Sequence, residues 1–227
     1  MKITVVGPLQ SGKSSYIKFL DDNALNVQVK GQNNTYYTVG MDLASLRLNG
    51  FDVFLFGTPG LLRFRVMREL VCSGADGFIF IFDAAHPEKD EDAISILNSI
   101  RNFTTSDIPI VYLANKQDLK EARSPEVIKV QNNLPDDCII FPTSAKTGLN
   151  INESIKYLVN EIYEKYKELL QTLQKYENDI KGLAEKLNKN KVEMRDFLNN
   201  LEIKRFIDVD RINKTYRVKK GLKKISS

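Results

Sequence analysis

A glycine-rich loop near the start of the chain carries residue types that can bind phosphate. The sequence GPLQSGKSS, residues 7–15, follows a short apolar run that contains Ile3, Val5 and Val6. A buried strand, a glycine turn and a helix in this order point backbone N–H groups and the positive end of the helix at an anion. We therefore expect this loop to hold the phosphates of a ligand.

Each position of the loop has an expected role. Gly7 and Gly12 permit the tight turn and a close approach of the backbone. Lys13 would bond the β- and γ-phosphates, and the Ser14 hydroxyl would bind Mg²⁺. The residues expected to contact phosphate from this loop are Gly7, Gln10, Ser11, Gly12, Lys13, Ser14 and Ser15.

A second motif decides between purines. VYLANKQD, residues 111–118, is a β-rich run that ends in a polar tetrapeptide. Asp118 can accept hydrogen bonds from N1–H and the exocyclic amine of guanine, a pair of donors that adenine lacks. The aliphatic part of Lys116 would cover the ring. The motif therefore indicates a guanine nucleotide.

A third segment, CIIFPTSAKTG at residues 138–148, is a short strand followed by a polar loop whose backbone could meet the base carbonyl. SAK alone is a weak signal, but GxxxxGKS, NKxD and SAK in this order are specific. With them, residues 1–160 resemble the Ras superfamily of small GTPases, and most of all its prokaryotic group related to the Arf and gliding-motility GTPases. The guanine-binding residues that this implies are Asn115, Lys116, Asp118, Ser144, Ala145 and Lys146.

The resemblance implies a P-loop α/β domain, a mostly parallel sheet flanked by helices, with GTP or GDP and Mg²⁺ as ligands. The residues support this fold independently. LRLNGFDVFLF has the Asn-Gly step of a two-residue hairpin, and GFIFIFDAA at residues 77–85 reads as a buried strand. Apolar residues at helical spacing separate the strands. The ligand should lie beyond the carboxyl ends of the strands.

FGTPGLLRF, residues 56–64, stands where the resemblance places a switch segment with the pattern DxxGQ. Gly60 keeps the backbone N–H expected to bond the γ-phosphate. Thr38, in TVGMD, resembles the switch threonine that contacts the same phosphate and completes the Mg²⁺ shell. Ser14 and Thr38 are thus the expected metal ligands, and loss of the γ-phosphate would release both loops.

Gly57 replaces the aspartate that usually holds Mg²⁺ through water. Asp42 is a candidate substitute, but four residues of extended chain from Thr38 span about 13 Å, so we assign Asp42 to a strand or an effector face. Asp83 could assist the metal or could be structural at a strand end. The FGTPG form occurs in the prokaryotic group that the chain resembles, so Gly57 does not by itself indicate a dead site.

Leu61 replaces the glutamine that orients the attacking water, and leucine has no hydrogen-bonding atoms. We expect very slow GTP hydrolysis unless an activating protein supplies a polar group or an arginine. Arg63 or Arg65 could act in cis or could contact a partner, so the catalytic residues stay unassigned. His86 precedes a proline, and we give it no catalytic role.

Composition limits the other possibilities. The hydrophobic fraction of 42% suits a folded core, and no apolar run approaches membrane-spanning length. MKITVVG does not resemble a signal peptide, and lipidation motifs are missing. Cys72 and Cys138 lack metal-ligand spacing. We expect a cytoplasmic protein without a membrane anchor.

The basic charge lies in the last third, where residues 160–227 hold 17 Lys and Arg against 11 Asp and Glu. We expect a GTPase domain over residues 1–162, joined by a continuous helix to a small α+β domain over 163–227 that resembles a winged helix-turn-helix. Its third helix and wing could contact duplex DNA. The candidate residues are Lys191, Arg195, Arg211, Lys214 and Arg217.

A second interpretation of this region stays open. Apolar residues also follow a heptad rhythm from residue 166 to residue 201, as in a coiled coil that forms a homodimer. Asn178-Asp179, Gly182 and the run at 188–191 argue against one continuous rod. In this alternative the chain is a GTP-dependent scaffold, and its last third binds an effector protein or a second copy.

Overall fold

The structure is a computed structural model that describes residues 1–25, 28–30, 36–38, 41–104 and 108–219. The chain divides into two compact units, one of residues 2–46 and 54–158, the other of Met1 and residues 47–53 and 159–227. The long helix α5 (Ile151–Lys175) runs without a break from the first unit into the second. The boundary at residue 162 stays a prediction.

The elements up to β8 follow each other in the order expected for an α/β fold. They are β1 (Lys2–Val6), α1 (Lys13–Leu20), β2 (Gln28–Lys30), β3 (Tyr36–Thr38), β4 (Asp42–Leu48), β5 (Phe51–Gly57), the 3-10 helix η1 (Leu62–Phe64), α2 (Arg65–Cys72), β6 (Gly77–Asp83), the 3-10 helix η2 (Pro87–Lys89), α3 (Asp90–Phe103), β7 (Ile110–Asn115), α4 (Pro125–Gln131) and β8 (Ile140–Pro142).

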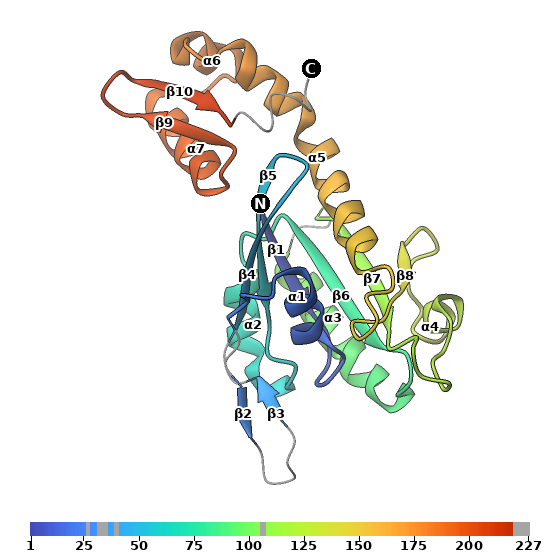
Figure 1. Ribbon diagram of the computed structural model, residues 1–227. Coiled ribbons are helices and arrows are strands. Elements are labelled where there is room, and N and C mark those ends of the chain that lie inside the picture. Colours follow the sequence, from blue (N-terminus) through green and yellow to red (C-terminus); the bar gives the residue numbers. More distant parts are fainter. Residues whose placement is uncertain (26–27, 31–35, 39–40, 105–107, 220–227) are drawn as a thin grey trace. The chain divides into compact units, whose positions relative to one another are not determined.

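The main sheet has six strands in the order β4-β5-β1-β6-β7-β8 (Figure 1). β1 pairs in parallel with β5 and β6, and β7 pairs in parallel with β6 and β8. The expected α/β class and mostly parallel sheet are confirmed. In a parallel sheet the carboxyl ends of neighbouring strands share one edge, so the loops after β1, β5, β6, β7 and β8 come together there.

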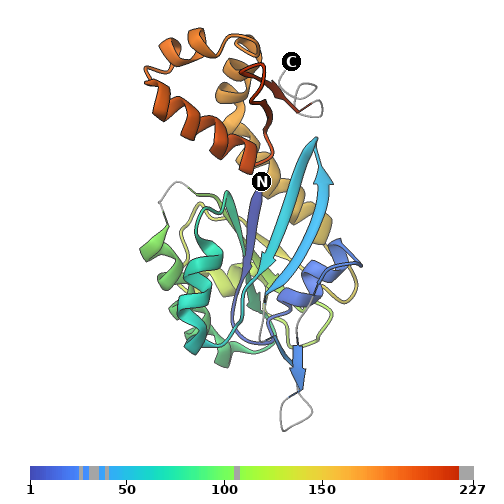
Figure 2. The same cartoon turned by 90° about the vertical axis from the view of Figure 1, so that its left-hand side faces the viewer.

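Side chains from one face of the sheet form a core with α2, α3 and α4. In Figure 2, α2 and α3 lie against this face and α1 lies against the other. Every residue of β6 is buried, which is why GFIFIFD contains no alternating polar positions. The buried members of this cluster include Phe78, Phe80, Phe82, Ala93, Ile96, Leu97, Ile100 and Ile128.

The hairpin β4–β5 turns where the sequence predicted. Asn49 and Gly50 have φ values of 47° and 78°, the left-handed pair that a two-residue hairpin turn requires and that Asn-Gly adopts readily. With seven residues in each strand, the pairing that starts at Leu48 and Phe51 places Asp42 opposite Gly57 at the far end.

The last unit continues from α5 into α6 (Ile180–Lys186), α7 (Lys191–Ile203), β9 (Ile207–Asp210) and β10 (Thr215–Val218). Asp179 and Asn190 accept backbone hydrogen bonds at the starts of α6 and α7, so the chain breaks into separate helices. The continuous rod is therefore wrong. The two predicted helices and the hairpin are present.

A compact core holds this unit together. Tyr216 is buried and its hydroxyl donates to the Leu173 carbonyl at 2.7 Å. The Phe51 ring at the hairpin turn makes edge contacts with Tyr163 and Phe206, with centroids 5.9 and 5.8 Å apart. Other buried members are Leu183, Met194, Leu198, Leu201, Ile207 and Val218. None of the helices in the described ranges has the length and apolar character needed to cross a membrane.

Candidate nucleotide-binding site

The glycine loop has the geometry that its sequence predicted. It follows β1, and α1 begins at Lys13. Gly12 has a φ of 101°, and a Cβ there would lie 2.2 Å from Nδ2 of Asn115. A Cβ on Gly7 would lie 2.4 Å from the Ile81 carbonyl oxygen. Because no side chain fits at either position, both glycines are required by close packing as well as by conformation.

The Lys13 ammonium lies inside this loop. Nζ donates to the Pro8 carbonyl at 2.6 Å, and burial lowers the pKa of Lys13 to about 7. A Cβ on Gly60 would lie 2.8 Å from the same Nζ, so Gly60 lies beside the phosphate loop. Its bond to the γ-phosphate stays a prediction. The Ser11 hydroxyl is buried and has no hydrogen-bond partner in the described part of the chain. Gln10 and Ser15 are exposed at the rim of the loop.

Asn115 joins the phosphate loop to the base motifs. Its Nδ2 donates to the Ser11 carbonyl at 2.8 Å, and its Oδ1 accepts from Ala145 N–H at 3.0 Å. The Thr143 hydroxyl donates to the same Oδ1 at 3.4 Å. A single buried amide therefore holds together the three segments that the sequence assigned to one ligand.

The carboxylate of Asp118 is fixed by residues of the third motif. Ser144 donates its hydroxyl to Oδ1 at 2.7 Å, and the Lys146 ammonium lies 3.7 Å from Oδ2. The Ser144 hydrogen bond, with a smaller contribution from Lys146, lowers the pKa of Asp118. The group is thus held ionised, as a receiver of two guanine N–H donors must be.

Lys116 is held by Asp83 at the end of β6, at 2.7 Å from Oδ2. Lys89 and His86 also donate to this carboxylate, at 2.8 and 2.9 Å. Burial alone would raise the pKa of Asp83, but these three hydrogen bonds together lower it. Asp83 is therefore a structural anion that positions Lys116. His86 belongs to this anchor.

The structure corrects the sequence interpretation of Asp42. Asp42 is the first residue of β4, but it is 1% exposed and its Oδ2 accepts from the Ser14 hydroxyl at 2.7 Å. Burial raises its pKa. Its place in a strand is as expected, but the buried carboxylate does not lie on an exposed effector face. Thr38 ends β3, and its side chain lies outside the described part of the structure, so its predicted roles stay predictions.

Arg68 is a second residue that the sequence interpretation missed. It lies on α2 and is 2% exposed. Its guanidinium donates to the carbonyls of Pro59, Leu61 and Leu62 at 3.3, 2.7 and 3.1 Å. Arg68 thus fixes the backbone of the switch segment to helix α2. Among the arginines weighed for catalysis, Arg65 is exposed and pairs with Glu69, and Arg63 is exposed.

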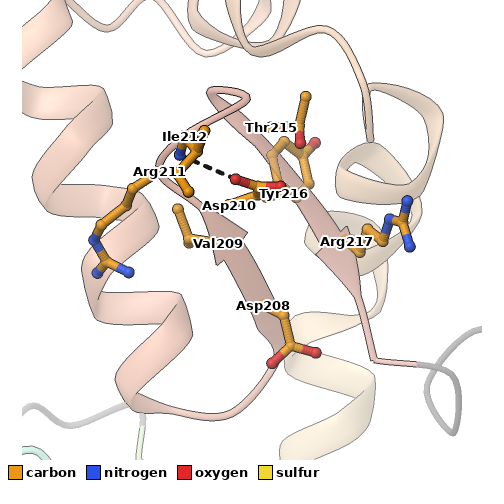
Figure 3. Close-up of a pocket in the computed structure, with 8 residues that line it drawn as sticks. All are labelled: Asp208, Val209, Asp210, Arg211, Ile212, Thr215, Tyr216 and Arg217. Atoms are coloured by element: carbon orange, nitrogen blue, oxygen red, sulfur yellow. Dashed lines mark hydrogen bonds between the residues drawn. The ribbon is translucent and has the colours of Figure 1, made fainter.

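The five basic residues predicted for DNA are all exposed. Figure 3 shows Arg211 and Arg217 on opposite sides of the β9–β10 hairpin, at the rim of a shallow pocket. Arg211 pairs with Glu202 of α7 at 2.6 Å, so it joins the hairpin to that helix. Arg195 pairs with its neighbour Asp196 at 3.3 Å. Lys191 and Lys214 make no ion pair with a described residue.

Comparison with known proteins agrees with this geometry. The family model described as "Ras family" matches residues 2–164. The chain is 26% identical over 167 residues to the Ras-related protein RABA2a of Arabidopsis thaliana, across 71% of this chain and 74% of that protein. It is 31% identical over 134 residues to the uncharacterized protein MJ1339 of Methanocaldococcus jannaschii, across 58% of this chain and 80% of that protein. The chain belongs to the Ras family.

Proposed function

We propose that the protein is a GTP-binding switch that selects guanine through Asp118 and hydrolyses GTP very slowly on its own. The observation that carries this proposal is the Asn115 amide, which ties the phosphate loop at Ser11 to the base loop at Ala145. With Asp118 fixed by Ser144, one connected network faces both ends of a guanine nucleotide. GTP and GDP are the proposed ligands, with Mg²⁺ as the cofactor.

The residues around Ser14 fit a divalent cation. The Ser14 hydroxyl has a carboxylate partner in Asp42, and one buried oxygen of that carboxylate has no partner in the described ranges. Oxygen donors of this kind suit Mg²⁺, which keeps several waters and shares its shell with nucleotide phosphates. When bound, Mg²⁺ neutralises charge on the β- and γ-phosphates. Lys13 would bind the same phosphates, and Gly60 N–H would meet the γ-phosphate.

Direct titration tests nucleotide choice. We expect isothermal titration calorimetry of the full chain with Mg²⁺ to give tight binding of GTP and GDP, and ATP binding weaker by about 10³-fold or more, because adenine leaves the Asp118 carboxylate unpaired. Equal affinities for ATP and GTP would overturn the assignment.

Slow hydrolysis is proposed because nothing at position 61 can orient water. The Leu61 side chain has no polar atom, and its carbonyl already accepts from Arg68. In single-turnover assays we expect Leu61→Gln to hydrolyse GTP faster by on the order of 10²-fold. Leu62→Gln is the matched control and should leave the rate unchanged. Wild-type hydrolysis within minutes, or equal rates for both variants, would contradict this account.

We further propose that residues 163–227 are the output module and resemble a winged helix. The helix order α6–α7 and the β9–β10 hairpin support this likeness, and the exposed Lys191, Lys214 and Arg217 make duplex DNA one candidate partner. The engaged pairs Arg195–Asp196 and Arg211–Glu202 favour the alternative, a surface that binds an effector protein or a second copy.

Fluorescence anisotropy with duplex DNA at several salt concentrations separates these partners. DNA binding should weaken steeply with salt, and Lys214→Glu together with Arg217→Glu should weaken it further. Concentration-dependent dimerisation without DNA affinity supports the alternative. Each titration is carried out with GTP and with GDP, because a switch must alter one of the two results.

A further inference from the structure

A buried carboxylate lies beside the phosphate loop without a complete set of partners. Asp42 accepts the Ser14 hydroxyl through Oδ2 at 2.7 Å. Its other oxygen, Oδ1, is buried and receives no hydrogen bond from any described residue. A buried polar atom without a partner is costly. The unpartnered Oδ1 therefore indicates a position where a ligand atom, a water molecule or an ion completes the contacts of this carboxylate.

Gly57 provides the space for this carboxylate. The hairpin turn at Asn49-Gly50 places Asp42 opposite Gly57, and a Cβ on Gly57 would lie 2.7 Å from Asp42 Oδ2 and 2.9 Å from Asp42 Cβ. Any side chain at position 57 would collide with the carboxylate. An acidic residue at one of these two positions therefore requires a very small residue at the other.

The charges expected around Asp42 Oδ1 limit the kind of group that it can contact. Lys13 and Ser14 belong to the loop that would hold the phosphates, so Asp42 would lie next to another anion. Two anions at this range repel strongly in a buried site unless a cation lies between them. In the described ranges no group of three or more His, Cys, Asp or Glu could hold a metal ion. Asp42 alone supplies few ligands for a cation, so we expect a cation here to be shared with the nucleotide, as Mg²⁺ commonly is.

We propose that Asp42 is the carboxylate of the Mg²⁺ site, and that Gly57 is glycine because it admits that carboxylate. The Ser14 hydroxyl donates to Oδ2, which leaves Oδ1 for the ion or for one of its waters. The inference rests on the proposed guanine-nucleotide function and assigns its metal site to a strand residue outside both switch segments.

The test is the release of a fluorescent GDP analogue from the full chain, in excess Mg²⁺ and in EDTA. In Mg²⁺, we expect Asp42→Asn to release the analogue about 10- to 100-fold faster than wild type. In EDTA, Asp42→Asn should release it no faster than wild type, because a negative charge beside the phosphates has been removed. Equal release rates in Mg²⁺, or faster release in both media, would overturn the inference.

A control separates metal binding from burial. Asp76 is also a buried carboxylate, and it accepts Lys2 N–H at 2.8 Å, at the opposite end of β1 from the phosphate loop. Asp76→Asn should keep the wild-type ratio of release rates between EDTA and Mg²⁺. Thermal unfolding of both variants shows whether either change acts through loss of the fold. Mn²⁺ binding to the GDP complex, followed by electron paramagnetic resonance, should weaken in Asp42→Asn only.

Moving the carboxylate from position 42 to position 57 tests the role of Gly57. Asp42→Gly should lose the Mg²⁺ effect on release, and adding Gly57→Asp together with Ile17→Val should restore most of it, since these two changes remove the Asp42 Cβ and the Ile17 Cδ1 that would lie 2.9 and 2.8 Å from a Cβ on residue 57. A folded triple variant without a Mg²⁺ effect would contradict the inference. The two proposals fail separately: wild type that binds no guanine nucleotide refutes the function, whereas wild type with Mg²⁺-dependent release that Asp42→Asn retains refutes only the metal assignment.

Discussion

The base side and the phosphate side of the site differ in how completely their polar groups are satisfied. On the base side, Asn115 bonds to Ser11 and Ala145, Asp118 bonds to Ser144, and Lys116 bonds to Asp83. These side chains are already fixed at the place where we propose that a purine binds. Binding there requires little rearrangement, which favours affinity.

The phosphate side is incomplete. Four buried side-chain atoms lack a hydrogen-bond partner in the described chain. Three of them lie on the phosphate side: Ser11 Oγ in the phosphate loop, Asp42 Oδ1 beside Ser14, and Arg68 Nε in the guanidinium that bonds to the switch segment. Burial also lowers the pKa of Lys13 to about 7. A ligand changes an equilibrium only through contacts that differ between states. We infer from this difference that contacts to the base supply most of the affinity for the nucleotide. Contacts to the phosphates change the conformation of the switch segment.

The largest effect is expected from a substitution that removes contacts to the base. Asp118→Ala removes two charge-assisted hydrogen bonds to guanine, at about 1.5–3 kcal/mol each, so GDP affinity should fall by about 10²–10⁴-fold. Discrimination against ATP should disappear in the same calorimetric titration. Asp137→Ala, an exposed carboxylate elsewhere, serves as control and should bind as wild type does. A smaller loss than tenfold would show that the carboxylate does not read the base.

A smaller effect is expected on the phosphate side. Arg68→Met removes the bonds to the carbonyls of Pro59, Leu61 and Leu62, and should lower the free energy of unfolding by about 1.5–3 kcal/mol. Amide hydrogen exchange at residues 59–62 should rise more than in β6. Arg65→Met, an exposed arginine on the same helix, should change stability by less than about 0.5 kcal/mol. Unchanged exchange in Arg68→Met would mean that the guanidinium does not restrain the switch segment.

The smallest effect is expected from a substitution that removes the support of Asp118 on the base side. Ser144→Ala removes the hydrogen bond that fixes Asp118, worth about 1 kcal/mol, so GDP affinity should fall about fivefold. The pKa of Asp118 should rise toward its ordinary value. Ser99→Ala, which deletes another buried hydroxyl, should leave affinity unchanged. If both serine variants bind GDP equally well, Asp118 is not positioned by Ser144.

The loops of the candidate site were predictable because their patterns are short and contiguous in the sequence. The glycine loop, NKQD and the Asn-Gly hairpin each occupy the positions their patterns indicated. Asp42 was correctly expected in a strand, but its contact with Ser14 was missed, because distance was measured along the chain from Thr38 and not from the register of the turn at 49–50, which pairs it with Gly57. That signal was in the sequence. Arg68 gave no such signal, because an arginine on an amphipathic helix usually faces water.

The Asn115 amide limits how the pocket could be retargeted. It needs a donor toward the Ser11 carbonyl and an acceptor toward Ala145 N–H. Aspartate would place oxygen against oxygen, and glutamine would need an extra methylene where Gly12 already leaves no room. A redesign for a different base is therefore confined to position 118 and its surroundings, and Asn115 has to be kept.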